Sequence, residues 1–115
     1  MKEARMARLA YQAIEEKKGL NPVILDLRGI TLIADYFIIT SGTSTTQVQA
    51  IANRVEELLK DEGVKPLNIE GLNSARWVLL DYGSVVVHVF LEEERDFYDL
   101  ERLWGDAKIV DIDSI

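Results

Sequence analysis

One stretch of the sequence constrains the fold more than any other: residues 76–90, RWVLLDYGSVVVHVF. Two apolar runs rich in Val and Leu flank the turn signal DYGS at residues 81–84. This pattern is typical of a β-hairpin. Counting outward from the turn predicts that Trp77 faces His88, whether the loop has two or four residues. We therefore expect the rest of the chain to be organised around two antiparallel strands.

The two faces of this hairpin differ in character, because successive side chains of a strand point to opposite faces. One face is wholly aliphatic and predicts core: Val78, Leu80, Val85, Val87 and Val89. The other face is mixed: Trp77, Leu79, Asp81, Ser84, Val86, His88 and Phe90. Because an aromatic residue, a histidine and a carboxylate share the mixed face, we expect the functional site there.

Length and charge limit the functions that the chain can serve. Its 115 residues suffice for one domain with one core. We expect this domain over residues 1–107, followed by a C-terminal tail at 108–115. The net charge of −7 argues against a broad surface for nucleic-acid phosphates. A basic protein is the better electrostatic partner.

The composition also argues against several kinds of site and location. The sequence has no cysteine and one histidine, which excludes disulfides, thiolate zinc sites and the usual histidine metal sites. No apolar run approaches the roughly 20 residues of a membrane helix. The N-terminus lacks the apolar core of a signal peptide. We therefore expect a cytoplasmic protein without a membrane partner.

Hydrophobic periodicity divides the chain into alternating helices and strands. Helical spacing of apolar residues predicts helices at 3–18, from Ser44 to Gly63, and from the acidic run 92–94 to Gly105. Apolar runs predict strands at 23–27, 36–40 and 66–70, in addition to the hairpin. The order α-β-β-α-β-β-β-α predicts an α/β fold, a mixed sheet of about five strands with helices packed on it. The tail from 106 to 115 is open between an extra strand and disorder.

The start of the second helix has two interpretations. Ser44 and Gln47 fit a capping box, in which the serine oxygen accepts from the third helical amide and the glutamine reaches back. The loop at residues 41–44 also looks like the strand–Gly-Ser–helix start of nucleotidyltransferases, which hold metal ions with carboxylates on adjacent strands. Asn68 and Glu70 have the spacing of two expected for such carboxylates, with an amide replacing one of them.

The mixed hairpin face is open to two interpretations as well. His88 is too far along the strand to activate Ser84, so we predict no catalytic triad. Trp77 beside His88 has the composition of a protein-binding hot spot, in which the histidine fixes the rotamer of the tryptophan. Alternatively, the C-terminal helix covers this face with Phe97, Leu100 and Trp104.

Several motifs together resemble the Iojap family, the ribosomal silencing factors. Three motifs are similar to the first half of the family's sequence pattern: DLRG at 26–29, DYFIITSGTS at 35–44 and QxxAIA at 47–52. The central signature of the family resembles WVLLDYG at 77–83 together with VVHVF at 86–90. Its closing signature resembles RxxYxLExLW at 95–104. The resemblance covers about residues 4–107 in the same order and spacing.

Two positions depart from the family pattern. Ser84 stands where an acidic residue is expected, and the loop at 71–75 lacks the acidic residues often found before the tryptophan. Both departures would weaken contacts with a basic partner, and neither contradicts the resemblance to the family.

The resemblance implies both a fold and a function. The implied fold is nucleotidyltransferase-like and has lost the metal carboxylates, in agreement with Asn68. The implied protein is not an enzyme and has no catalytic residues, metal or cofactor. It docks on the large ribosomal subunit through large-subunit protein fourteen, with little or no direct rRNA contact. Bound there, it blocks joining of the small subunit and represses translation when nutrients are scarce. A homodimer of the free protein is a further expectation, because it would bury the mixed face.

The hairpin is accordingly the expected partner-binding site. The expected contact residues are Trp77, Leu79, Asp81, Tyr82, Gly83 and His88, with Tyr98 and Trp104 as secondary candidates. Two alternatives remain open: a large-subunit assembly factor that uses the same surface, and a small nucleotidyltransferase that uses the loop at 41–44.

Overall fold

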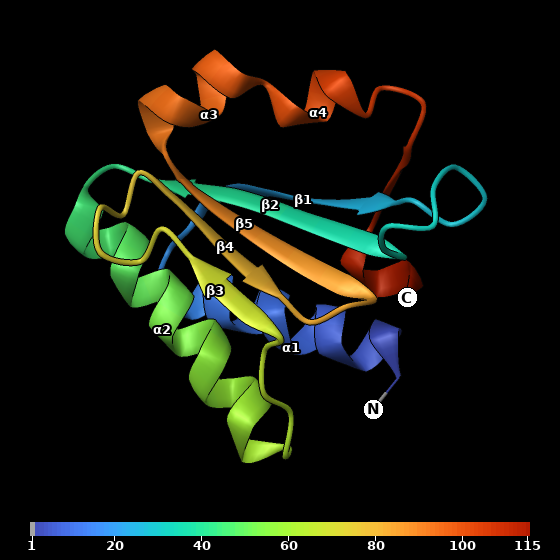
Figure 1. Ribbon diagram of the computed structural model, residues 1–115, viewed down its shortest axis with the longest axis horizontal. Coiled ribbons are helices and arrows are strands. Elements are labelled where there is room, and N and C mark those ends of the chain that lie inside the picture. Colours follow the sequence, from blue (N-terminus) through green and yellow to red (C-terminus); the bar gives the residue numbers. More distant parts are fainter. Residues whose placement is uncertain (1) are drawn as a thin grey trace.

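A six-stranded mixed sheet with helices on both faces forms the fold in the computed structural model, which describes residues 2–115 (Figure 1). Met1, the first residue of the expected domain, lies outside the described residues. The helices are α1 (Glu3–Glu16), α2 (Thr45–Asp61), α3 (Glu92–Tyr98) and α4 (Leu100–Leu103). The strands are β1 (Leu20–Asp26), β2 (Tyr36–Gly42), β3 (Asn68–Glu70), β4 (Trp77–Asp81), β5 (Val85–Leu91) and β6 (Lys108–Val110). The predicted mixed α/β fold is confirmed.

The sheet order explains how distant segments meet. The strands lie in the order β3-β4-β5-β2-β1-β6. The pair β2 and β5 is parallel, and every other neighbouring pair is antiparallel. The short strand β3 lies at an edge, and it begins at Asn68, two residues later than the predicted strand at 66–70. The sheet therefore has the hairpin β4–β5 inside it and a short strand at each edge.

The C-terminal tail supplies the sixth strand. β6 pairs with β1, so that Val110 lies opposite Ile24, and a 3-10 turn at Ile112–Ser114 follows. The tail thus forms the extra strand, which was one of its two expected states. The number of strands rises from about five to six for this reason, and residues 108–115 pack with the domain.

Two amphipathic helices cover one face of the sheet. In Figure 1, α1 and α2 lie together below it. α1 buries Met6, Ala7, Ala10, Ala13 and Ile14, and α2 buries Val48, Ile51, Ala52, Val55 and Leu59. These stripes pack on the aliphatic hairpin face, which is buried as predicted, and together they form the helix-side core. None of the helices formed by residues 2–115 is long and apolar enough to cross a membrane.

The N-terminus of α2 is capped by side chains. The Ser44 Oγ accepts from the Gln47 amide at 3.1 Å, as the capping box predicts. The Gln47 Oε1 accepts from the Thr43 amide at 2.8 Å, so the glutamine reaches back as predicted, to the amide one residue before the N-cap. The Gln47 Nε2 donates to the carbonyl oxygens of Lys17 and Lys18. Gln47 is therefore bound at both ends, and it ties the end of α1 to the start of α2.

We expect Ser44→Ala to destabilise the protein by about 1 kcal/mol, because one amide of the first helical turn loses its acceptor. The free energy of unfolding, measured by urea titration, tests this. Thr46→Ala is the matched control, since Thr46 is exposed two residues further along the chain and is not the N-cap residue of α2. Equal stability of the two variants would contradict a capping role for Ser44.

The hairpin register differs from the predicted one. Trp77 lies opposite Phe90, and Leu79 lies opposite His88, so the predicted pairing of Trp77 with His88 is wrong by two residues. The turn lies one residue further along the chain than predicted, because the Tyr82 amide donates to the Val85 carbonyl at 2.9 Å and this bond encloses Gly83 and Ser84 as the loop. A shift by two residues keeps every side chain on its face. The predicted division of the hairpin into two faces is therefore unaffected.

The C-terminal helical segment is broken where one helix was expected. Asp99 adopts the left-handed conformation, with φ of 47°, and separates α3 from α4. Aspartate tolerates this conformation better than most residues other than glycine. In Figure 1 the two short helices cross the upper face of the sheet, opposite α1 and α2. We refer to them as the α3–α4 cover.

Candidate protein-binding surface

The α3–α4 cover protects only part of the upper sheet face. A second core lies under the cover, where Leu100 packs against residues of β1, β2, β5 and the β1–β2 loop. Its buried residues are Leu25, Leu27, Ala34, Phe37, Ile39, Val86, Phe90 and Leu100. β3 and β4 lie beyond this cover (Figure 1). The upper face of these two strands carries Asn68, Glu70, Trp77, Leu79 and Asp81, which we call the open face. Both interpretations of the mixed face thus hold in part, since its β5 side is covered and its β4 side is not.

Arg95 holds the cover in place. Its side chain is buried, and its guanidinium donates to the carbonyl oxygens of Leu20 and Asn21 and to the Ser41 Oγ. A further bond joins its Nε to the Glu101 carboxylate at 3.2 Å. A guanidinium can serve several acceptors at once because its five N–H donors form a rigid fork. Arg95 thereby fixes α3 and α4 against β1 and β2 and leaves β4 uncovered.

Trp77 is fixed in orientation at the border between the cover and the open face. Its Nε1 donates to the His88 Nδ1 at 3.1 Å, which confirms the predicted contact between these two residues. The contact is diagonal, since Leu79 rather than Trp77 lies directly opposite His88. The Trp77 ring also packs at 4.8 Å from the Phe90 ring and 4.9 Å from the Tyr98 ring, between centroids. The half-buried indole is therefore preorganised.

His88 positions Trp77 from below the surface. It is 3% exposed, so a partner cannot reach it, and its expected place among the contact residues is corrected to a supporting one. Burial lowers its pKa to about 4, which leaves the ring uncharged at neutral pH. Because the Nδ1 accepts from Trp77, the proton of the neutral ring is on the Nε2. Among residues 2–115, the Nε2 has no hydrogen-bond partner.

Acid should destabilise the protein through His88. The pKa is about 4 in the folded state against an ordinary value of 6.5, so the unfolded state binds more protons between these values. The free energy of unfolding therefore falls as the pH falls from 6.5 to 4, by a total of about 3 kcal/mol. Urea unfolding at several pH values should show this slope in the wild type and a flatter one in His88→Gln. Parallel slopes would show that His88 is not the source.

Two other expected contact residues lie at the turn. Tyr82 is 7% exposed and packs in the helix-side core, so its expected place on the docking surface is wrong. Its side chain points away from Asp81 because neighbouring strand residues face opposite sides, and burial raises the pKa of its hydroxyl. Gly83 is half-buried, with φ of 86°, and its amide donates to the Asp81 Oδ1 at 2.8 Å. Asp81 is half-buried on the open face.

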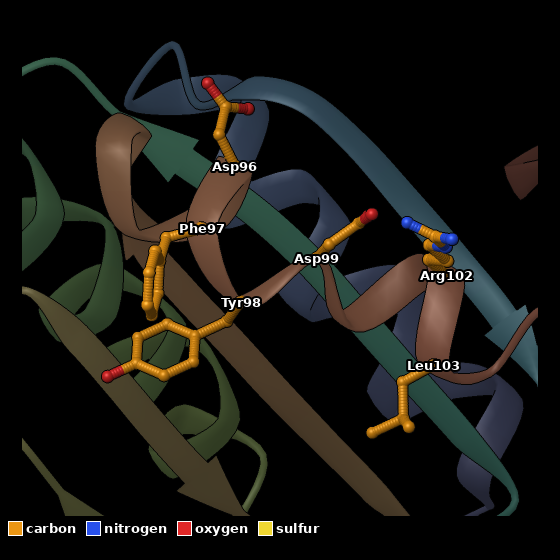
Figure 2. A pocket seen from close by; sticks show the side chains of 6 residues that line it. All are labelled: Asp96, Phe97, Tyr98, Asp99, Arg102 and Leu103. Carbon is orange, nitrogen blue, oxygen red and sulfur yellow. The ribbon is translucent and has the colours of Figure 1, made fainter.

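The break in the cover exposes apolar side chains of this segment, among them Phe97, which the sequence pattern assigned to the covering face. Phe97 is 82% exposed and Leu103 is 74% exposed, and both line a hollow of about 610 Å³. Figure 2 shows the Phe97 and Tyr98 rings close together on the same side of α3. Of the secondary candidates, Tyr98 is therefore at the surface. Trp104 is half-buried instead, 5.7 Å from the Phe37 ring.

The residues considered for nucleotidyl transfer do not converge. The loop at 41–44 follows β2, whereas Asn68 and Glu70 are on β3, and β4 and β5 lie between these strands. Two intervening strands separate them by about 14 Å, at 4.8 Å per strand. The Asn68 Nδ2 donates to the Glu70 Oε2 at 2.8 Å, which pairs the two side chains with each other. Residues 2–115 contain no group of three acidic, His or Cys side chains suited to a metal ion.

The fold and this surface define a class: a small α/β domain with an uncovered, tryptophan-centred patch on one half of a sheet face. The sequence model of one family, described as ribosomal silencing factor during starvation, matches residues 1–115. The chain belongs to this family.

Two bacterial ribosomal silencing factors are similar to nearly all of this chain. A ribosomal silencing factor of Halalkalibacterium halodurans is 44% identical over 115 residues, which is all of this chain and 98% of that protein. One of Bacillus subtilis is 44% identical over 98% of this chain and 96% of its own. A crystal structure of a Chromobacterium violaceum protein has a TM-score of 0.89 at 43% identity, covering 91% of this chain and 88% of its own. More distantly, a mouse protein named for mitochondrial assembly of the ribosomal large subunit is 40% identical over 61% of this chain and 32% of its own.

Proposed function

We propose that this protein represses translation by binding the large ribosomal subunit through large-subunit protein fourteen, with the open face as the docking surface. Bound there, it prevents the small subunit from joining when nutrients are scarce. The observation that carries this proposal is the preorganised Trp77 at the border of the open face. Membership in the silencing-factor family supports the ribosome as the target.

The chemistry of the open face favours a basic protein. Trp77 and Leu79 offer apolar surface, and Asp81 and Glu70 add negative charge beside them. A central aromatic anchor with a charged rim is the usual composition of a protein-binding hot spot. The net charge of −7 favours a cationic protein partner over direct contact with rRNA phosphates.

Repression by this route requires no chemistry from the protein. A blocker acts by occupying a surface that the small subunit needs, so affinity and position are its only requirements. We place its action in the cytoplasm, with no cofactor, metal ion or catalytic residue. A homodimer of the free protein that buries the open face would compete with docking.

A subunit-joining experiment tests the proposal. Purified large subunits are incubated with the protein, small subunits are added, and the complete ribosomes are measured on a sucrose gradient. We expect the complete ribosomes to decrease in proportion to the bound protein. Ser44→Ala, altered only in the α2 cap, should block joining as the wild type does. Undiminished joining with the protein bound to the large subunit would contradict the blocking role.

A second candidate function is assembly of the large subunit, favoured by the name of the mouse relative. Both functions use the same surface, so cells lacking the protein must distinguish them. An assembly factor predicts incomplete large subunits during growth in rich medium. A silencing factor predicts normal subunits in rich medium and an excess of complete ribosomes in starvation.

A further inference from the structure

A second hollow lies beside the open face, between β4 and α3. Its volume is about 390 Å³, and it is lined by Ser74, Arg76, Trp77, Glu94, Phe97 and Tyr98. Three of these residues are aromatic and one is a carboxylate. Trp77 also lines a hollow of about 300 Å³ with Glu70 and Leu79, so the two hollows adjoin at the open face. We call the first one the Glu94 pocket.

Arg76, one of the residues that line the Glu94 pocket, already binds the Glu94 carboxylate with its guanidinium. The Arg76 Nη1 donates to the Glu94 Oε1. The side chain of Glu94 is 16% exposed, whereas that of Arg76 is 65% exposed. Within residues 2–115, Glu94 is the only residue that accepts a hydrogen bond from the Arg76 side chain. The Glu94 carboxylate is therefore largely shielded from solvent. The Arg76 guanidinium, by contrast, is mostly in solvent and is bound only by that carboxylate within residues 2–115.

This asymmetry distinguishes Arg76 from Arg95. Arg95 is buried and donates to four acceptors on three segments, so it cannot leave without loss of structure. Arg76 can swing into solvent without breaking another hydrogen bond within residues 2–115. Only the Arg76 member of this ion pair is mostly exposed, and an ion pair whose cation lies in solvent contributes little to stability because water screens it.

We propose that the Glu94 pocket receives an arginine side chain of the protein partner, which replaces Arg76 on Glu94. This inference rests on the proposed docking and adds the chemistry that the pocket recognises. A planar guanidinium fits a carboxylate by paired hydrogen bonds and stacks on aromatic rings. The Phe97 and Tyr98 rings, 5.1 Å apart between centroids, line the pocket and supply such rings.

The charges around the pocket favour an incoming cation. Glu93 and Asp96 are exposed on α3 on either side of Glu94, and Arg76 is the one cationic residue that lines the pocket. When a partner arginine displaces Arg76, the Glu94 carboxylate keeps one cationic partner and Arg76 becomes hydrated. The exchange does not leave the shielded Glu94 carboxylate without a cation. The cost of binding at this pocket is therefore the displacement of Arg76 from Glu94.

Variants of the ion pair should change affinity in opposite directions. We expect Glu94→Gln to weaken large-subunit binding about tenfold, since a charge-assisted hydrogen bond is lost. Arg76→Ala should strengthen binding about two- to fivefold, because the competing cation is removed. Glu93→Gln, one residue away and exposed, is the matched control and should change affinity less than twofold. Weaker binding in both Arg76→Ala and Glu94→Gln would show that the ion pair is merely structural and overturn the proposal.

A second measurement separates this inference from the proposed function. The peptide acetyl-Ala-Arg-Ala-amide is titrated into the free protein while the Trp77 indole N–H resonance is followed by NMR. We expect a saturable shift that is larger in Arg76→Ala, absent in Glu94→Gln, and absent when citrulline, uncharged and similar in shape, replaces the arginine. Equal shifts with both peptides, or none with either, would overturn the pocket whether or not the protein binds ribosomes. Peptide binding without large-subunit binding would refute the proposed function alone.

Discussion

Trp77→Ala should reduce affinity for the large subunit by at least about 30-fold, or about 2 kcal/mol, while the domain stays folded. The substitution removes the indole that β5 and α3 hold in a fixed orientation. It also leaves the His88 Nδ1 without its donor, so stability should fall by about 1–3 kcal/mol. The helix-side core remains intact, because Val78 and Leu80 point to the opposite face.

Sedimentation with large subunits measures this effect, and circular dichroism checks folding. Trp77→Phe separates the two contributions of the indole, since it keeps an aromatic ring and loses the N–H donor. We expect it to bind between the wild type and Trp77→Ala. Leu32→Ala is the control for loss of exposed apolar surface elsewhere, because Leu32 is fully exposed on the β1–β2 loop. A folded Trp77→Ala protein that binds like the wild type would move the docking surface away from β4.

Asp81→Lys should weaken large-subunit binding as strongly as Trp77→Ala, by about 30-fold or more, since like charges across an interface cost several kcal/mol. The structure adds a complication, because the Asp81 Oδ1 also accepts from the Gly83 amide in the turn. Asp81→Asn resolves it, since asparagine keeps an acceptor at this position and removes only the charge. We expect Asp81→Asn to fold like the wild type and to weaken binding about three- to tenfold.

Salt distinguishes charge from turn geometry in this comparison. High salt should weaken wild-type binding and have less effect on Asp81→Asn, since screening acts on the charge that asparagine lacks. If Asp81→Asn binds like the wild type at low salt and only Asp81→Lys fails, a charge reversal or a damaged turn explains the loss. Attraction between Asp81 and a basic partner would then be excluded.

The division of the hairpin into a core face and a mixed face could be predicted because it depends only on alternation. Val78 and Leu80 belong to an uninterrupted aliphatic set, and both are buried. The register could not be found by counting, because the two-residue loop lies at Gly83 and Ser84, one residue further along the chain than the loop assumed at Tyr82 and Gly83. The register error left the site intact only because it equals two residues. An error of one would have exchanged the faces.

Burial within the site was harder to predict than its location. The position of Tyr82 next to the turn predicts that a partner can reach it, although alternation puts its side chain on the other face. Phe97 and Leu103 fit a buried helical stripe, and the local conformation of Asp99 breaks the periodicity on which that expectation depends. The spacing of apolar residues does not reveal a single residue in the left-handed conformation. The only signal in the sequence is the residue type, because Asp adopts this conformation more readily than most residues.

Sedimentation of the wild-type protein with separately purified subunits tests the central claim most directly. The protein is mixed with large or with small subunits at near-physiological salt, and the pellets are compared with a pellet of protein alone. We predict near-stoichiometric recovery with the large subunit and background recovery with the small one. Background recovery with the large subunit, or equal recovery with both, would contradict the account.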